Sequence, residues 1–350
     1  MVRPSPDFGR LRRVLLRQGE PDRVPLVELH VDPAVGGKAI GFPPAGDPLE
    51  WAIGFWYRAG YDFVEVCPPI DFPGRLGHQA QDPGFLSTGL RTWPQEHDNV
   101  IGSWADLERY PWPQPHQVDY SVYERAGKML PEGMAIIPNT AGVFEYSSWL
   151  MGIESFCLAC AEQPDLVAAV VERVGEFLVQ VYETLADVPG VGALWLGDDM
   201  GSNLGTFIHP DLLRRWIFPY HRRIAQAAHR RGLPFILHSC GNLKRIIPDL
   251  VEYVGIDALH SLPANIYDIG ALKRQWGDRL ALIGNVDVDL LSRGTPDQVR
   301  AAVRRLLTEV APGGGFALGS SNSIPDYVKA ENYRALLEET MEHGRYPIRQ

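Results

Sequence analysis

Short apolar runs alternate with longer amphipathic stretches along most of the chain. Each run holds four to eight residues, mostly Val, Ile, Leu, Phe and Ala. The runs are largely apolar on both faces, as strands covered by helices must be. Eight runs of this kind predict eight strands: Val24–Val31, Phe63–Cys67, Ala135–Asn139, Ala193–Leu196, Phe235–His238, Ala258–Leu262, Leu280–Gly284 and Gly315–Leu318.

The amphipathic stretches between these runs carry the start and stop signals of helices. Their apolar residues recur at three- and four-residue spacing, and a proline often stands in the first turn. The clearest are Pro164–Leu185, Pro210–Arg231, Asp297–Val310 and Asp326–Glu342. Because strand and helix alternate eight times, we expect an α/β protein with a (β/α)8 TIM barrel, in which residues 1–350 form a single domain.

One segment interrupts this alternation. Pro69–Pro115 is rich in Gly, Pro and Trp. It predicts a β-hairpin or long loop inserted after strand two, at the mouth of the barrel. Insertions at that face usually shape the substrate site. A surface excursion with no role is the alternative.

Composition excludes several classes of function. The net charge of −10 argues against a nucleic-acid partner, which would require a basic face. No apolar stretch reaches the length of a membrane span, and the first residues lack the apolar core of a signal peptide. Four cysteines are too few for a disulfide framework, so we expect a cytoplasmic protein. The Cys157–Cys160 pair lies in a helical pattern and is interpreted as helix packing.

Candidate chemistry is concentrated at the predicted strand ends, where barrels place their active sites. The polar residues found there are Glu28, His30, Asp32, Glu65, Cys67, Asn139, Asp198, Asp199, His238, Cys240, His260, Asn285, Asp287, Ser320, Ser321 and Asn322. A rim that serves packing alone does not need so many ionisable groups.

The sharpest of these patterns is the sequence HSCGN. His238 and Cys240 are two apart on an extended segment, so their side chains project from the same face. Imidazole and thiolate together are half of a typical zinc site. Gly241 would let the chain turn sharply off the strand. A neutral histidine beside a buried free cysteine is the alternative.

Two further clusters leave alternatives open. The adjacent Asp198 and Asp199 point to opposite sides of their strand. One can face the cavity as a base, substrate anchor or metal ligand, while the other bonds backbone amides or caps a helix. Glu28, His30 and Asp32 alternate with apolar residues, so they share one face, either inward at the mouth or on a solvated rim.

Several motifs resemble the uroporphyrinogen decarboxylase superfamily. They are PDRVPLVELHVDP, AGVFEYSSWLMGIESFCLACAEQPDL, GDDMGS, HSCGN, LALIGNVDVDLLSRGT and PGGGFALGSSNSI, which match in order and spacing over almost the whole chain. The resemblance implies a (β/α)8 barrel. It also implies one of two chemistries, namely metal-free decarboxylation of uroporphyrinogen or methyl transfer involving corrinoid proteins or thiols at zinc held by an H-x-C motif and a later cysteine.

Two departures from the family pattern bear on this choice. The arginine-rich signature that holds the carboxylates in the decarboxylase is missing, since that strand contains VELHVDP here. The later cysteine of the methyltransferases is replaced by Ser320 and Ser321, and neutral serine is a poor zinc ligand. The third ligand is therefore open among Glu28, His30, Asp32, Glu65, Cys67, Asp198 and Asp199, of which Glu28 is our choice.

The sequence therefore predicts a zinc-dependent methyltransferase or demethylase. It would move a methyl group from a small methylated, for example methoxylated, substrate to a separate corrinoid protein, and the resemblance makes a homodimer an expectation. The expected roles are metal binding by His238, Cys240 and Glu28, acid–base catalysis by Asp198, Asp199 and His260, and substrate contact by His30, Asp32, Asn139, Asn285, Ser321 and Asn322. A metal-free lyase with Asp199 or His260 as proton donor, and a non-catalytic binding barrel, are the alternatives.

Overall fold

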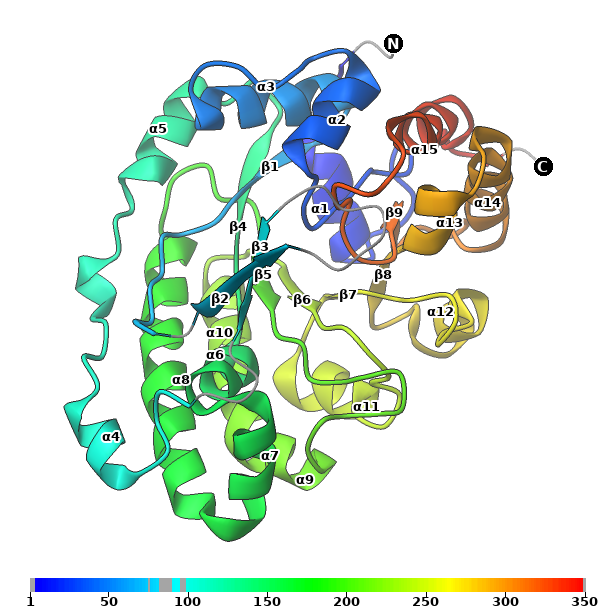
Figure 1. Ribbon diagram of the computed structural model, residues 1–350. Coiled ribbons are helices and arrows are strands. Elements are labelled where there is room, and N and C mark those ends of the chain that lie inside the picture. The colour runs from blue at the N-terminus through cyan, green and yellow to red at the C-terminus, as the bar shows by residue number, and fades with distance from the viewer. Residues whose placement is uncertain (1–3, 75, 82–89, 95–98, 349–350) are drawn as a thin grey trace.

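Seven parallel strands form one curved sheet that helices surround (Figure 1). The computed structural model describes residues 4–74, 76–81, 90–94 and 99–348. In sheet order the strands are β1 (Phe63–Val66), β4 (Ala135–Thr140), β5 (Leu194–Gly197), β6 (Phe235–His238), β7 (Ala258–His260), β8 (Ala281–Val286) and β9 (Phe316–Ser320). Neighbours in the sheet follow one another in the barrel sequence, so all carboxyl ends lie on one side.

The helices of the described residues follow the strands as the amphipathic pattern predicts. They are α1 (Phe8–Leu15), α2 (Pro33–Ile40), α3 (Pro48–Ala59), α4 (Trp104–Arg109), α5 (Ser121–Met129), α6 (Val143–Met151), α7 (Ile153–Glu162), α8 (Pro164–Ala186), α9 (Pro210–Leu212), α10 (Phe218–Arg230), α11 (Ile247–Asp249), α12 (Ile269–Trp276), α13 (Val288–Arg293), α14 (Pro296–Glu309) and α15 (Ala330–His343). The helix expected at Pro210–Arg231 is divided by a π-helical turn, Leu213–Ile217.

The first predicted strand, Val24–Val31, is not a regular strand. It lies beside β9 and makes isolated parallel bridges, Leu26 to Leu318 and Val31 to Ile324. The backbone amide of Val27 donates to the Leu318 carbonyl at 2.9 Å. The protein is therefore the expected (β/α)8 barrel, in which the first strand position is filled by an extended segment with broken pairing.

The inserted segment contains a β-hairpin, as predicted. β2 (Leu76–Gln81) pairs antiparallel with β3 (Leu90–Pro94), with an irregularity in register between Leu76 and His78. The hairpin follows the carboxyl end of β1, so it belongs to the side of the barrel where functional loops are found. The turn between its strands lies outside the described residues.

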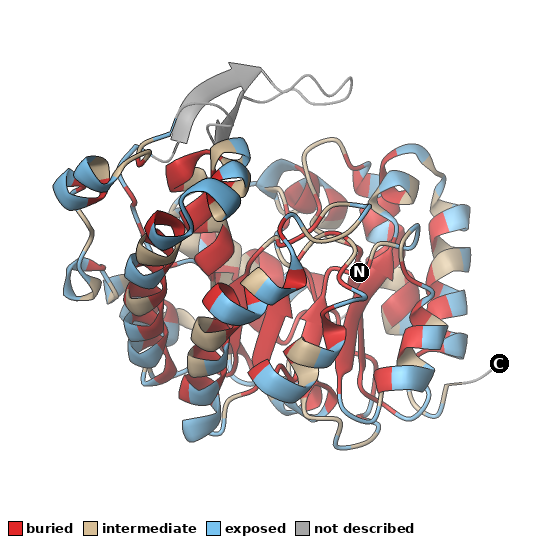
Figure 2. Ribbon diagram, turned by 90° about the horizontal axis from the view of Figure 1, so that it is seen from below, coloured by how far each residue is buried: buried red, intermediate tan, exposed pale blue. Residues whose placement is uncertain are grey.

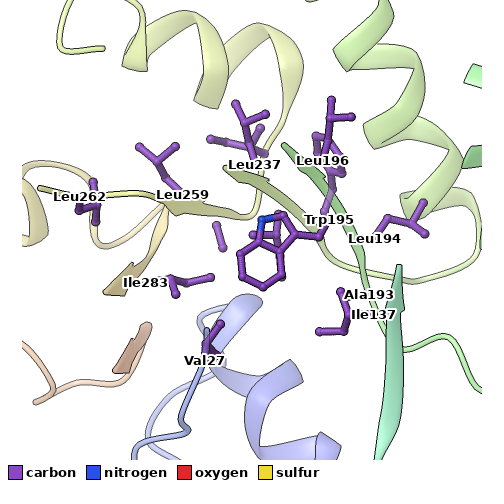
Figure 3. Packing of buried hydrophobic residues seen from close by; sticks show 14 of the residues in the cluster. Val27, Ile137, Ala193, Leu194, Trp195, Leu196, Leu237, Leu259, Leu262 and Ile283 are labelled. Atoms are coloured by element: carbon purple, nitrogen blue, oxygen red, sulfur yellow. The ribbon is translucent and has the colours of Figure 1, made fainter. Parts of the chain in front are cut away.

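The core lies between the strands and the inner sides of the helices (Figure 2). β5 and β8 are buried at every position, which explains why they are apolar apart from Asn285. Trp195 lies at the centre of this packing, with Val27 and Ile283 close to its ring (Figure 3). Within the described residues, none of the helices combines the length and apolarity that crossing a bilayer requires.

Candidate metal centre

Three side chains with metal-binding atoms meet at the carboxyl ends of β5 and β6. Asp199, His238 and Cys240 each offer one ligand atom, and all three atoms lie within 4.8 Å of one another. His238 Nε2 is 3.3 Å from Asp199 Oδ1 and 3.5 Å from Cys240 Sγ. The Asp199 side chain is 36% exposed, so the cluster is open on one side. An open side is what a catalytic metal site requires for its substrate.

Local backbone geometry brings these three groups together. His238 and Cys240 project in the same direction because they are two apart on an extended segment. The backbone amide of Cys240 donates to Asp199 Oδ1 at 2.7 Å, which fixes the carboxylate beside the thiol. Gly241 has φ +90°, and a Cβ there would lie 2.3 Å from the Gly201 backbone. Only glycine therefore allows the chain to turn directly after Cys240.

The electrostatics of this cluster oppose an ionised Cys240 thiolate unless a cation is bound beside it. Burial and the Asp199 carboxylate raise the pKa of the Cys240 thiol, so the sulfur keeps its proton when no cation is present. Burial also opposes ionisation of Asp199, but His238 and the Cys240 amide lower its pKa overall. Imidazole, thiolate and carboxylate are all ligands of zinc. The residues present therefore fit the metal that the resemblance implies.

Asn322 contacts the same sulfur from the loop after β9. Its Nδ2 donates to Cys240 Sγ at 3.2 Å. A donor in this position stabilises negative charge on sulfur, as a thiolate ligand requires. Asn322 was expected to contact substrate, and the structure places it against the candidate metal ligand, where that expectation stays a prediction.

Asp198, expected as an acid or base, is fully buried and engaged in structural bonds. Its two carboxylate oxygens accept from the backbone amides of Phe144 and Glu145, in the first turn of α6. His221 Nε2 lies 2.6 Å from Oδ2. A Cβ at position 142 would lie 2.2 Å from the Asp198 Cγ, so Gly142 is needed for this approach. Asp198 caps α6, and Asp199 is the member of the pair that faces the cluster.

Glu145 is a further acidic residue beside the cluster that the sequence reasoning did not select. Burial, together with the negative charges of Asp199 and Asp198, raises its pKa well above the usual value. It stands in the first turn of α6, and its own backbone amide donates to Asp198 Oδ1 at 2.9 Å. The only sequence signal for it is its place in the GVFE motif of the resemblance.

His260 lies behind His238, on the neighbouring strand β7. It is fully buried, and its Nδ1 is 2.7 Å from His238 Nδ1. Burial lowers its pKa well below the usual value. This placement is at odds with the expected acid–base role, because a side chain closed off by His238 and the core cannot touch a substrate in the cavity.

Glu28, the third ligand chosen from the sequence, is held elsewhere. It is fully buried, and its carboxyl oxygens accept from the backbone amide and the hydroxyl of Ser320, at 2.7 and 2.6 Å. His30 is exposed and Asp32 accepts from the first amides of α2, so the three do not share one environment. The expected alternation fails because Val24–Val31 is not a regular strand.

A second polar group lies at the carboxyl ends of β1 and β4. Glu65 accepts from Asn139 Nδ2 at 3.1 Å and from the Cys67 thiol at 3.4 Å, and His30 Nδ1 is 3.7 Å away. Asn139 Oδ1 is buried without a partner in the described part of the chain. His30, Glu65 and Cys67 line a cavity of about 500 Å³, together with apolar residues that include Trp51.

Two other residues expected to touch substrate make structural hydrogen bonds. Asn285 is buried, and its side chain donates to the backbone carbonyl of Leu262. Ser321 is buried as well, and its backbone carbonyl accepts from the Ser261 hydroxyl at 2.6 Å. The first contact joins the ends of the neighbouring strands β7 and β8, and the second links the segments that follow β7 and β9, so both stabilise the rim of the barrel there.

The protein is thus a parallel α/β barrel whose strand ends bring together an imidazole, a thiol and a carboxylate as a candidate metal centre. The family model described as uroporphyrinogen decarboxylase (URO-D) matches residues 87–343. The chain belongs to this family.

Relatives in the family have two different functions. A methylated-thiol–coenzyme M methyltransferase from Methanosarcina mazei is 27% identical over 267 residues, covering 74% of this chain and 64% of that protein. The match thus spans less than two thirds of that relative. A uroporphyrinogen decarboxylase from Alkalilimnicola ehrlichii is 25% identical over 275 residues, covering 73% of this chain and 72% of that protein. Among solved structures, a methyltransferase from Methanosarcina mazei has the same fold, with a TM-score of 0.70 at 21% identity over 95% of this chain and 97% of that one.

Proposed function

We propose that this protein is a zinc-dependent methyltransferase. It takes a methyl group from a small methylated substrate and passes it to a corrinoid protein. The observation that carries the proposal is the convergence of Asp199, His238 and Cys240 at the open end of the barrel. The methyltransferase relative from Methanosarcina mazei supports methyl transfer as the reaction class.

His238, Cys240 and Asp199 would hold the zinc ion. A zinc ion bound there would supply Lewis acidity to the heteroatom that carries the methyl group. The Asn322 amide steadies the Cys240 sulfur by its hydrogen bond, and the Cys240 amide orients Asp199. Glu145, whose pKa is raised by burial and by the charges of Asp199 and Asp198, would supply a proton to the heteroatom when the methyl group has left.

The cavity beside β1 would receive the rest of the substrate, although Asp199, His238 and Cys240 are not among the residues that line it. Its volume suits a small organic molecule, and its walls are mostly apolar. Among the described residues that line it, Glu65 and His30 are the ionisable side chains besides the Cys67 thiol, and none is Lys or Arg. A polyanionic tetrapyrrole would require cations there. These features favour a neutral methyl ether or thioether over uroporphyrinogen.

The test measures metal content and methyl transfer together. Wild type, Cys240→Ala and Asp199→Ala are purified without an affinity tag and offered zinc, with Cys160→Ala in α7 as the matched cysteine control. We expect about one zinc per chain in wild type and the control, and a large loss in the other two. Free cobalamin in its reduced state serves as surrogate acceptor, and formation of methylcobalamin from methyl ethers and thioethers is followed by absorbance.

Two results would overturn the proposal. A wild-type chain that takes up no zinc would favour the metal-free lyase instead. Zinc uptake that Cys240→Ala leaves unchanged would place the metal elsewhere in the chain.

A further inference from the structure

His238 makes contacts through both ring nitrogens, and this constrains its protonation. Nε2 faces Asp199 and Cys240, while Nδ1 lies 2.7 Å from the Nδ1 of His260. The two histidines stand at paired positions of β6 and β7, so the sheet register itself sets this approach. The contact is therefore a fixed feature of the barrel end.

A contact of 2.7 Å between two imidazole nitrogens needs one proton between them. With two protons the N–H groups would clash, and with none the lone pairs would repel. If the proton belongs to His238, then Nε2 of a neutral His238 carries a free lone pair toward Asp199 and Cys240. If it belongs to His260, then Nε2 of a neutral His238 carries the other proton and cannot bind a metal.

Without a cation, the Asp199 carboxylate draws the proton to Nε2 of His238. With a cation bound between His238, Asp199 and Cys240, the surroundings of His260 favour the first arrangement. It is fully buried, with the edge of Trp195 against its ring at 5.3 Å between centroids. Its Nε2 has no hydrogen-bond partner among the described residues. A backbone interaction with Ser320 raises its pKa, as a carbonyl oxygen does and an amide N–H does not. A carbonyl only accepts, so it favours a proton on Nε2 of His260 and leaves Nδ1 as the acceptor.

We infer that His260 is a positioning residue for the metal centre. Its Nδ1 accepts the Nδ1 proton of His238 and so holds His238 in the tautomer whose Nε2 can bind a metal. The inference rests on the proposed metal centre and assigns His260 a role that does not require contact with substrate. In other metal sites, groups that orient a ligating histidine in this way change metal affinity by about 10- to 100-fold.

The test compares two substitutions of similar size. His260→Asn keeps an acceptor oxygen close to the position of Nδ1, whereas His260→Leu has none. Affinity for Co2+ is measured by competition with a chelating dye, and the absorption bands of the cobalt-loaded chain report the ligands. We expect His260→Leu to weaken cobalt binding by about 10- to 100-fold and His260→Asn to restore most of it. The sulfur-to-cobalt band of Cys240 should persist in both.

A measurement on wild type keeps the inference testable if His260→Leu does not fold. Nitrogen-15 NMR of histidine-labelled, zinc-loaded chain should show His238 with zinc on Nε2 and a proton on Nδ1, assigned by its absence in His238→Asn. Equal cobalt affinity in wild type and His260→Leu, or equal losses in both variants, would overturn the role of His260 alone. A wild-type chain that binds neither cobalt nor zinc would overturn the proposed metal centre as well.

Discussion

Glu28 offers a sharp test because its carboxyl is buried and no cation among the described residues shifts its pKa. Burial raises its pKa from 4.5 to about 8, although hydrogen bonds from Ser320 offset part of the effect. The substitution Glu28→Gln keeps the shape and the acceptor for the Ser320 amide. The Ser320 hydroxyl donates to Oε2 of the ionised carboxylate, and it would accept from the Gln amide as it would from a protonated Oε2. The variant therefore differs from the protonated wild type mainly in being unable to ionise.

The sign of the effect follows from the raised pKa. At acidic pH the carboxyl is protonated in both folded and unfolded chains. Between the two pKa values the carboxyl is ionised only in the unfolded chain. The free energy of unfolding of wild type therefore falls by about 1.4 kcal/mol per pH unit as the pH rises. From about pH 5 to about pH 8 this amounts to roughly 3 to 4 kcal/mol that Glu28→Gln does not lose.

Denaturant unfolding of both chains at the two pH values measures this difference. Glu132→Gln, at an exposed position, is the control, and its free energy of unfolding should differ from that of wild type by the same amount at both pH values. If the difference in free energy of unfolding between wild type and Glu28→Gln were the same at both pH values, the reasoning would be refuted. Zinc content should be unchanged in Glu28→Gln. A loss of zinc would return Glu28 to the ligand set that the sequence suggested.

Three further outcomes are expected. Asp198→Ala should lower the free energy of unfolding by roughly 3 kcal/mol, because two amides of α6 and His221 lose a buried partner; a loss below about 1 kcal/mol would contradict the capping role. Zinc affinity should rise about tenfold per pH unit near neutrality, because binding displaces the proton that burial holds on Cys240; an affinity independent of pH in chelator competition would contradict this. Trp195→Ala should lower the free energy of unfolding by about 3 to 5 kcal/mol, against little change for the half-exposed Trp104→Ala; equal effects would contradict the packing.

The fold could be predicted from the sequence because each strand–helix unit carries its own signals. Seven of the eight predicted strands are present with ends shifted by at most two residues, and the hairpin occurs within the predicted insertion. The exception is Val24–Val31. Its apolar run is buried as predicted, but its pairing depends on the distant β9, so local alternation could not show that Glu28 would be buried and His30 exposed.

The candidate site was predictable where its residues are close in the chain. His238 and Cys240 come together because two-residue spacing on an extended segment fixes their direction. The neighbouring pair of aspartates could be placed on opposite sides for the same reason. Which of them faces the cluster depends on α6, whose first amides hold Asp198 from a segment more than fifty residues earlier.

The sequence by itself thus determined the barrel, the hairpin and the His238–Cys240 pair, because periodicity and short spacing act through local backbone geometry. Only the tertiary structure decided that Asp199 completes the cluster in place of Glu28 and that His260 stands behind His238. Those choices depend on strand register and on which buried amides and hydroxyls are left to satisfy each carboxyl. Such contacts join residues far apart in the chain, and no local pattern records them.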